Sequence, residues 1–249
     1  MQKQRVVFVH GAGSFGAAAW PKQHGMALRY DALFLKRHGF DAQTEPLESD
    51  IPADVDMLLE CLGASETVPD GGSARGGHVV AHSQGAISAM LAAVERPDLV
   101  RSLVLVEPAC LSLTAELPAT AAYKALMEPL FLVRHELSDD DYQREYLRRA
   151  FSSEAAVLDT PEARRTARRL RLQAPPWEAP LHIVPGVPTL VLTGGWEPLY
   201  EEIAGYLQET GALHRVAAGG HRPNDSVEGD RIIRSFIADV SRAGSVHSS

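Results

Sequence analysis

Short runs of consecutive apolar residues recur along the chain, separated by longer stretches in which apolar residues follow helical spacing. The clearest strand candidates lie at residues 6–9, 79–81, 101–107, 187–193 and 214–218. A continuous apolar run is typical of a strand that is buried on both faces of a parallel sheet. The pattern therefore predicts a strand at each of these positions.

Helical patterns connect these candidates. We predict helices at residues 20–37, 51–62, 84–96, 199–210 and 226–241, a weaker strand at 40–47, a polar connection at 65–77 and a disordered tail at 242–249. Buried strands that alternate with crossover helices indicate a right-handed, mostly parallel α/β architecture.

One long stretch departs from this alternation. Between residues 109 and 185 the pattern predicts helices only, at 115–132, 138–151 and 161–172. Ser138 followed by three aspartates is a favourable helix start. Their side chains can accept hydrogen bonds from the first backbone N–H groups of the helix, and the positive end of the helix dipole stabilises their negative charge. We therefore predict a core made of residues 1–108 and 186–249, with a helical cap, 109–185, inserted into it.

Composition is that of a globular protein. The chain has 249 residues, 45% of them hydrophobic and 22% charged, and a net charge of −8. Its basic cluster, at residues 164–171, lies on a predicted helix and indicates a solvated face, not a nucleic-acid partner. The first strand begins at Val6 and no apolar run is long enough to span a bilayer, so we predict a cytoplasmic protein without a membrane partner. Cys61 and Cys110 are isolated and indicate neither a disulfide nor a metal site.

The apolar run at 79–81 ends in Ala81-His82-Ser83-Gln84-Gly85. A serine at a tight turn between a strand and a helix can project its hydroxyl above the end of a sheet, with the following N–H, here that of Gln84, pointing into the same space. A serine is equally common there as a helix N-cap. The pentapeptide leaves both interpretations open.

The first strand ends in His10-Gly11-Ala12-Gly13. Small residues let backbone N–H groups approach a ligand, and the Ala12 N–H could share an oxyanion with the Gln84 N–H. A flexible glycine turn is the alternative. A phosphate-binding role is disfavoured, because the chain has no glycine-lysine-serine or glycine-lysine-threonine motif and no acidic residue placed after the second strand to bind a ribose.

Taken together, these motifs resemble those of the α/β-hydrolase superfamily: a His-Gly loop after the first strand, a serine elbow, an acid after a later strand, and His221 before the final helix. The order Ser, acid, His is also that of the family. The resemblance covers residues 6–240, and it implies the α/β-hydrolase fold with about six strands, Ser83 as nucleophile and His221 as general base. The chain departs from the family pattern in two ways: Ala81 stands in place of the first glycine of the elbow, and the N-terminal hairpin strands of many members are absent.

Two glutamates follow strands where members of the superfamily carry the acid of the triad. Glu107 lies 24 residues after the serine, at a site where some members carry glutamate, and Glu197 follows a later strand. We favour Glu107, because its strand neighbours that of the nucleophile. Glu197 is also placed to cap the helix that begins near Leu199. The sequence leaves both acids open.

The resemblance implies a serine hydrolase that cleaves a carboxylic ester, lactone or thioester of a medium-sized apolar small molecule through an acyl-enzyme, with no cofactor or metal. A non-hydrolytic lyase on the same scaffold and a hydrolase-derived ligand receptor are the alternatives. The oligomeric state is not indicated. The candidate pocket walls, which could equally form the interior of the cap, are His10, Gly11, His82, Leu111, Tyr123, Met127, Phe131 and Trp177.

Overall fold

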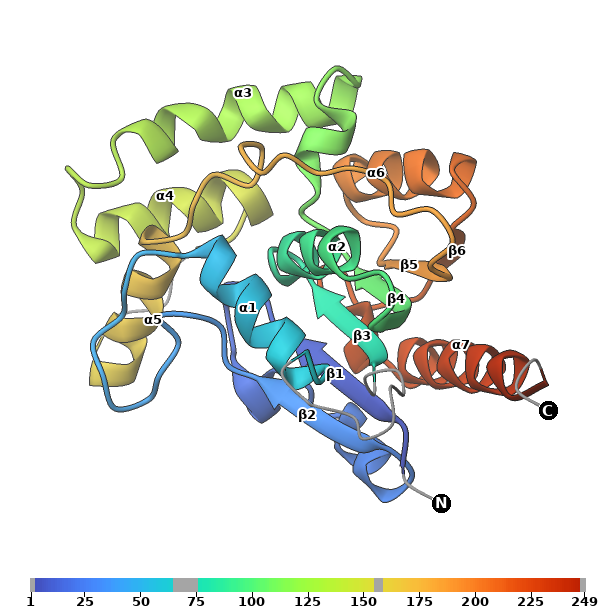
Figure 1. Ribbon diagram of the computed structural model, residues 1–249. Coiled ribbons are helices and arrows are strands. Elements are labelled where there is room, and N and C mark those ends of the chain that lie inside the picture. The colour runs from blue at the N-terminus through green and yellow to red at the C-terminus, as the bar shows by residue number, and fades with distance from the viewer. Residues whose placement is uncertain (1–2, 65–75, 155–158, 247–249) are drawn as a thin grey trace.

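The computed structural model describes residues 3–64, 76–154 and 159–246. Six parallel strands form one sheet in the order β2-β1-β3-β4-β5-β6, which confirms the predicted parallel α/β architecture (Figure 1). The strands are β1 (Arg5–Val9), β2 (Asp31–Leu35), β3 (Gly77–His82), β4 (Val100–Val106), β5 (Thr189–Thr193) and β6 (Leu213–Val216). Ser83 and Glu107 therefore follow the carboxyl ends of two neighbouring strands.

Both faces of the sheet are covered, as the continuous apolar runs require. Alternate strand residues point to opposite faces, so that Val7 and Val9 join one core cluster whereas Val6 and Phe8 join the other. The first cluster is covered by α1 (Ile51–Cys61), α2 (Gly85–Glu95) and α6 (Pro198–Glu209), and the second by η1 (Gly16–Ala19), η2 (Gln23–Leu28) and α7 (Val227–Val246).

Helices joined by loops are the regular elements of the described chain between β4 and β5. It contains η4 (Leu111–Thr114), α3 (Pro118–Leu132), α4 (Asp139–Phe151) and α5 (Pro161–Arg171), and α3 and α4 lie at the top of the view in Figure 1, outside the sheet. Ser138 is the N-cap of α4, where its hydroxyl accepts the Asp141 N–H at 3.1 Å. These helices share a small core of their own, formed by Met127, Leu130, Phe131, Tyr142 and Ala150.

The predicted helix at 20–37 is wrong. The chain there makes one short 3-10 helix, η2, and then the edge strand β2, whose Phe34 stacks on Phe8 of β1 with ring centroids 4.9 Å apart. Residues 32–35 are a short uninterrupted apolar run, which periodicity alone does not assign to helix or strand. The weak strand predicted at 40–47 has no regular structure.

The C-terminal prediction is wrong in part, because α7 continues to Val246 and makes 242–246 helical; residues 247–249 lie outside the described residues. Most of the predicted polar connection, residues 65–75, also lies outside them. Among the helices that are described, none combines the length and the apolar character needed to cross a bilayer.

Candidate active site

Ser83 occupies the turn between β3 and α2 in a left-handed backbone conformation, with φ of 52°. Its N–H donates to Val106 O at 3.0 Å, and its carbonyl oxygen accepts the N–H groups of Ala86 and Ala109 at 3.0 and 3.1 Å. A non-glycine residue in this conformation costs of order 1–3 kcal/mol, which the surrounding structure must hold in place. The strain is what points the serine side chain away from the sheet.

Gly85 lets the elbow approach β1. A Cβ at this position would lie 2.5 Å from His10 O and 2.7 Å from Val9 O, distances that no side chain tolerates. Ala81, by contrast, sits inside β3 and is fully buried in the core, so its methyl group is accommodated where the family pattern has glycine. The packing of the elbow against β1 therefore requires a glycine at position 85 but not at position 81.

His221 lies in the loop between β6 and η5 (Pro223–Asp225), next to the end of β5. The two chain segments touch at Gly194 and Gly220: a Cβ on Gly194 would lie 2.0 Å from Gly220 O. This approach brings the imidazole Nδ1 to 3.3 Å from Glu107 Oε2. The histidine and the acid thus meet across the carboxyl ends of β4 and β5.

Glu107 is fully buried and accepts hydrogen bonds at both carboxylate oxygens. Oε1 accepts the Gly194 N–H at 2.6 Å, and Oε2 accepts the Trp196 Nε1–H at 2.9 Å beside the contact with His221. Burial raises the pKa of Glu107 to about 7, although these two hydrogen bonds act in the opposite direction. The side chain is therefore fixed toward His221 and titrates close to neutral pH.

Glu197 does not reach the histidine. It is the N-cap residue of α6, with extended backbone at φ −130° and ψ 119°, and its side chain accepts no capping hydrogen bond. No hydrogen bond or ion pair joins it to His221 among the residues described. Of the two acids that the sequence left open, the structure brings Glu107 to the imidazole.

Aromatic rings surround His221. Its ring centroid lies 5.2 Å from that of Tyr200 and 5.3 Å from that of Phe151, and burial together with the charge of Arg222 lowers the pKa of His221 to about 4. His82, whose buried ring is 4.7 Å away, donates from Nε2 to the His221 carbonyl oxygen at 2.8 Å. The imidazole is thus neutral at physiological pH and ready to accept a proton.

Ser83 and His221 face one cavity of about 290 Å³. No hydrogen bond joins the serine hydroxyl to the imidazole within the described ranges. Such hydrogen bonds are often long before substrate binds and tighten in the complex. The cavity is lined by Ala12, Gly13, Ser14, His82, Ser83, Gln143, Tyr146, Leu147, Phe151, Thr166, Leu170, His221 and Arg222.

The loop after β1 forms one side of this cavity through Ala12 and the two residues that follow it. The backbone N–H groups of Ala12 and Gln84 donate to no acceptor among the residues described, so both are available to a ligand. Gly11 does not line the cavity but passes directly behind Ser83, where a Cβ would lie 3.0 Å from the serine Cβ.

His10 is a fixed part of this loop and does not reach the cavity. Its Nε2 accepts the Arg37 N–H at 3.1 Å, so its Nδ1 must carry the proton that it donates to Gly11 O at 2.7 Å. Burial lowers the pKa of His10 to about 3. This histidine therefore stays neutral and holds the loop without taking part in proton transfer.

Of the predicted pocket residues, only His82 lies at the cavity wall. Leu111 belongs to the sheet core, Met127 and Phe131 to the small core of the inserted helices, and Tyr123 and Trp177 pack between those two clusters. The physical reason is that α3 packs behind α4 and against α6, so its apolar side chains are used in helix packing.

Sequence reasoning missed the walls that α4 and α5 supply. Gln143, Tyr146, Leu147 and Phe151 recur on one face of α4, and Thr166 and Leu170 are one turn apart on α5. Spacings of three, four and eight residues place side chains on one face of a helix. That stripe was visible in the sequence, but nothing in the pattern indicated that this face, and not that of α3, looks toward Ser83.

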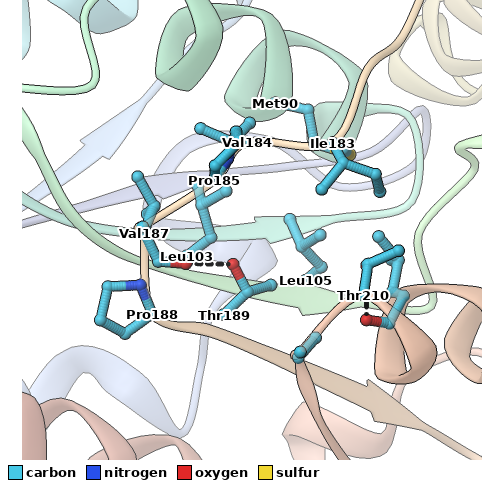
Figure 2. Close-up of a pocket in the computed structure, with 14 residues that line it drawn as sticks. Met90, Leu103, Leu105, Ile183, Val184, Pro185, Val187, Pro188, Thr189 and Thr210 are labelled. Atoms are coloured by element: carbon cyan, nitrogen blue, oxygen red, sulfur yellow. Dashed lines mark hydrogen bonds between the residues drawn. The ribbon is translucent and has the colours of Figure 1, made fainter.

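A second cavity of about 360 Å³ lies near the amino end of β5, and Ser83 is not among the residues that line it (Figure 2). Its walls come from β4, α2, α6 and residues 183–189, and they contain no histidine, cysteine, serine or charged side chain. The hydroxyls of Thr189 and Thr210 are occupied by Val187 O and Leu207 O. This cavity offers no nucleophile, and the smaller one is the candidate active site.

No group of three or more histidine, cysteine, aspartate or glutamate side chains in residues 3–64, 76–154 and 159–246 is arranged to hold a metal ion.

The Trp196 hydrogen bond allows a test through pH. If catalysis needs an ionised Glu107 and a neutral His221, activity rises with pH and its midpoint follows the higher of the two pKa values, about 7. Trp196→Phe removes a donor that lowers the pKa of Glu107. We expect the midpoint of the kcat/KM profile to move upward by about one pH unit, since a hydrogen bond to a charged group contributes about 1.5 kcal/mol. An unchanged midpoint would assign the titration to another group.

Comparisons with known proteins identify the family and the fold. The sequence model described as the alpha/beta hydrolase family matches residues 6–234. No curated protein sequence matches the chain.

Solved structures with the same fold include a carboxylesterase from Nitrososphaera gargenis, which is 15% identical over 97% of this chain and 92% of its own, with a TM-score of 0.63. A haloalkane dehalogenase variant from Bradyrhizobium elkanii is 18% identical over 98% and 92%, with a TM-score of 0.65. The type II thioesterase BorB from the borrelidin biosynthetic cluster is 21% identical over 96% and 92%, with a TM-score of 0.63. At these identities the similarity shows a shared fold.

Proposed function

We propose that this chain, which belongs to the alpha/beta hydrolase family, is a serine hydrolase that cleaves carboxylic esters, lactones or thioesters through an acyl-enzyme. The observation that carries the proposal is that Ser83 and His221 line one cavity, while the buried Glu107 carboxylate lies 3.3 Å from the imidazole Nδ1. Family membership supports hydrolase chemistry, and the residue types at the site favour attack by serine.

In the proposed reaction, Ser83 Oγ attacks the carbonyl carbon of the substrate while His221 Nε2 takes the hydroxyl proton. The carbonyl electron pair moves onto oxygen, where the N–H groups of Ala12 and Gln84 stabilise the charge. Glu107 keeps the proton of the resting imidazole on Nδ1 and stabilises the imidazolium that forms. Collapse of the intermediate expels the alcohol or thiol, which takes its proton from Nε2.

The second half of the reaction repeats these steps with water. His221 takes a proton from a water molecule, whose oxygen attacks the acyl carbon, and the collapse of the second intermediate returns the proton to Ser83 Oγ. The products are a carboxylic acid and the free serine. Residues 109–185 act as a cap in this proposal, because α4 and α5 close the cavity over Ser83.

The cavity favours a neutral substrate of small to medium size. Its cap side combines apolar Leu147, Phe151 and Leu170 with uncharged polar side chains and carries no charged group. Arg222 is the cationic side chain at the wall, and its guanidinium is already paired with Asp225 at 2.6 Å. A substrate carboxylate would therefore find no free positive charge among the described wall residues.

A fluorophosphonate probe with a mass-spectrometric readout tests the nucleophile directly. We expect the wild-type protein to be labelled at Ser83 and to hydrolyse a series of p-nitrophenyl esters, thioesters and lactones, with loss of both in Ser83→Ala. Activity that survives in Ser83→Ala would replace the acyl-enzyme with lyase chemistry that uses His221 alone. Labelling without turnover of any substrate would instead favour a ligand receptor.

A further inference from the structure

Gln143 differs from the other residues of the cavity wall because its side-chain amide has no hydrogen-bond partner among the described residues. Its Oε1 is buried without a hydrogen bond, and no hydrogen bond joins its Nε2 to any described residue. The residue projects from α4 into the same cavity that Ser83 and His221 line. A buried polar atom left unpaired is rare in folded proteins and calls for a ligand, a water molecule or a functional reason.

Leaving the amide unpaired is unfavourable. A buried acceptor without a partner costs of order 1–3 kcal/mol, and a methionine or leucine of similar size would avoid that cost. Of the other wall residues on α4 and α5, Leu147, Phe151 and Leu170 offer no hydrogen-bonding group, and the Tyr146 hydroxyl is paired with that of Tyr123. Gln143 therefore makes the cavity less favourable for a purely apolar ligand than its other walls suggest.

Thr166 adds a second polar group to this part of the wall. It projects from α5, which packs against α4, and its hydroxyl makes no hydrogen bond to a described residue. The two residues thus provide an amide and a hydroxyl from two adjacent helices of the insertion. They face a cavity whose chemically reactive groups lie on the core strands and loops.

We propose that Gln143 and Thr166 form a polar subsite that binds a hydroxyl group on the part of the substrate that enters this cavity. The inference rests on the proposed hydrolase function and specifies the substrate as a neutral, hydroxylated ester, thioester or lactone. A hydroxyl group both donates and accepts, so it pairs with the Gln143 amide in either orientation of that amide and with Thr166 as well. A charged group is disfavoured, because Arg222 is paired and the described wall has no free counter-charge.

The proposed subsite predicts that the protein prefers hydroxylated substrates to analogues that lack the hydroxyl group. A site built to hydrogen-bond a substrate hydroxyl discriminates against the analogue that lacks it, because the polar atoms of the site then stay unpaired in the complex. We expect kcat/KM for a β-hydroxy or ω-hydroxy substrate to exceed that for the plain analogue by at least about tenfold. The position of the hydroxyl that gives the largest ratio would report its distance from the scissile carbonyl.

The experiment compares matched substrate pairs in four proteins: wild type, Gln143→Met, Thr166→Val and the control Gln208→Met on the exposed end of α6. One series places the hydroxyl on the acyl chain of p-nitrophenyl esters, and the other places it on the alcohol of butyrate esters. The expected result is a preference in at least one series that falls toward unity in Gln143→Met, falls in part in Thr166→Val and persists in Gln208→Met. A ratio near unity for wild type in both series, or one that survives in both wall variants, would overturn the subsite.

A binding measurement separates failure of the subsite from failure of the hydrolase proposal. Calorimetric titration of Ser83→Ala with an alkyl methyl ketone and with its hydroxylated analogue needs no turnover. Ser83→Ala should bind the hydroxylated ketone more tightly than the plain one. If the double variant with Ser83→Ala and Gln143→Met loses this difference, the result supports the subsite even if no ester is cleaved. Equal binding of the two ketones rejects it, even if Ser83 reacts with a fluorophosphonate and esters are hydrolysed.

Discussion

Replacing Ser83 with alanine should lower kcat for ester hydrolysis by about 10⁴- to 10⁶-fold, the range seen when the nucleophile of a catalytic triad is removed. The loss is large because the hydroxyl forms the covalent bond, and the imidazole at 221 has no other proton to take in the first step. Steady-state rates on a p-nitrophenyl ester, with single-turnover rates for slow variants, measure it. A loss of less than tenfold would contradict an acyl-enzyme formed on Ser83.

The same position makes a separate prediction about stability. Ser83 holds φ at 52°, a conformation that glycine adopts with little strain. Ser83→Gly should therefore raise the free energy of unfolding by about 1 kcal/mol relative to Ser83→Ala, although both variants are inactive. Urea unfolding of the two variants provides the comparison. Equal midpoints would show that the elbow is held by its hydrogen bonds without measurable strain.

Ser83 and His221 could be found in the sequence because the residues next to each of them in the chain indicate its position in the fold. Ser83 follows a buried strand and precedes a helix of small residues, and His221 follows two glycines that permit close approach to another segment. Each signal comes from a few neighbouring residues. For the same reason, the strands with continuous apolar runs were predicted within a few residues of their observed bounds.

The features that could not be predicted from the sequence depend on contacts between segments that are distant in the chain. The run at residues 32–35 becomes a strand because it pairs with β1, and nothing within the run itself distinguishes a strand from part of a helix. Likewise, α3 and α4 are both helices with apolar faces, and only their packing decides which of them faces Ser83. The choice between Glu107 and Glu197 required the position of the His221 loop relative to β4 and β5.

Glu107→Gln should reduce kcat/KM by about 10³- to 10⁴-fold, as expected when the acid of a triad becomes an amide. The carboxylate accepts from Gly194, Trp196 and His221 at once. A glutamine must turn its NH₂ group toward one of these donors. If that group faces His221, the imidazole proton moves to Nε2, and the nitrogen that should take the Ser83 proton is no longer an acceptor.

Glu197→Gln is the matched control, because it makes the same chemical change in a residue that does not contact His221. It should leave kcat/KM within about twofold of wild type, because the Glu197 side chain neither contacts His221 nor lines the cavity. The reverse ordering of the two variants would transfer the acid role to Glu197.

The pH profile of Glu107→Gln supplies a readout that simple misfolding would not produce. In wild type, the kcat/KM profile should rise through pH 7, because Glu107 has its pKa raised to about 7 by burial and must be ionised to act. Glutamine removes that titration. The residual activity then depends on neutral His221, whose pKa is lowered to about 4, so the profile should be flat from about pH 5 upward. A step near pH 7 that persists in the variant would place the titrating group elsewhere.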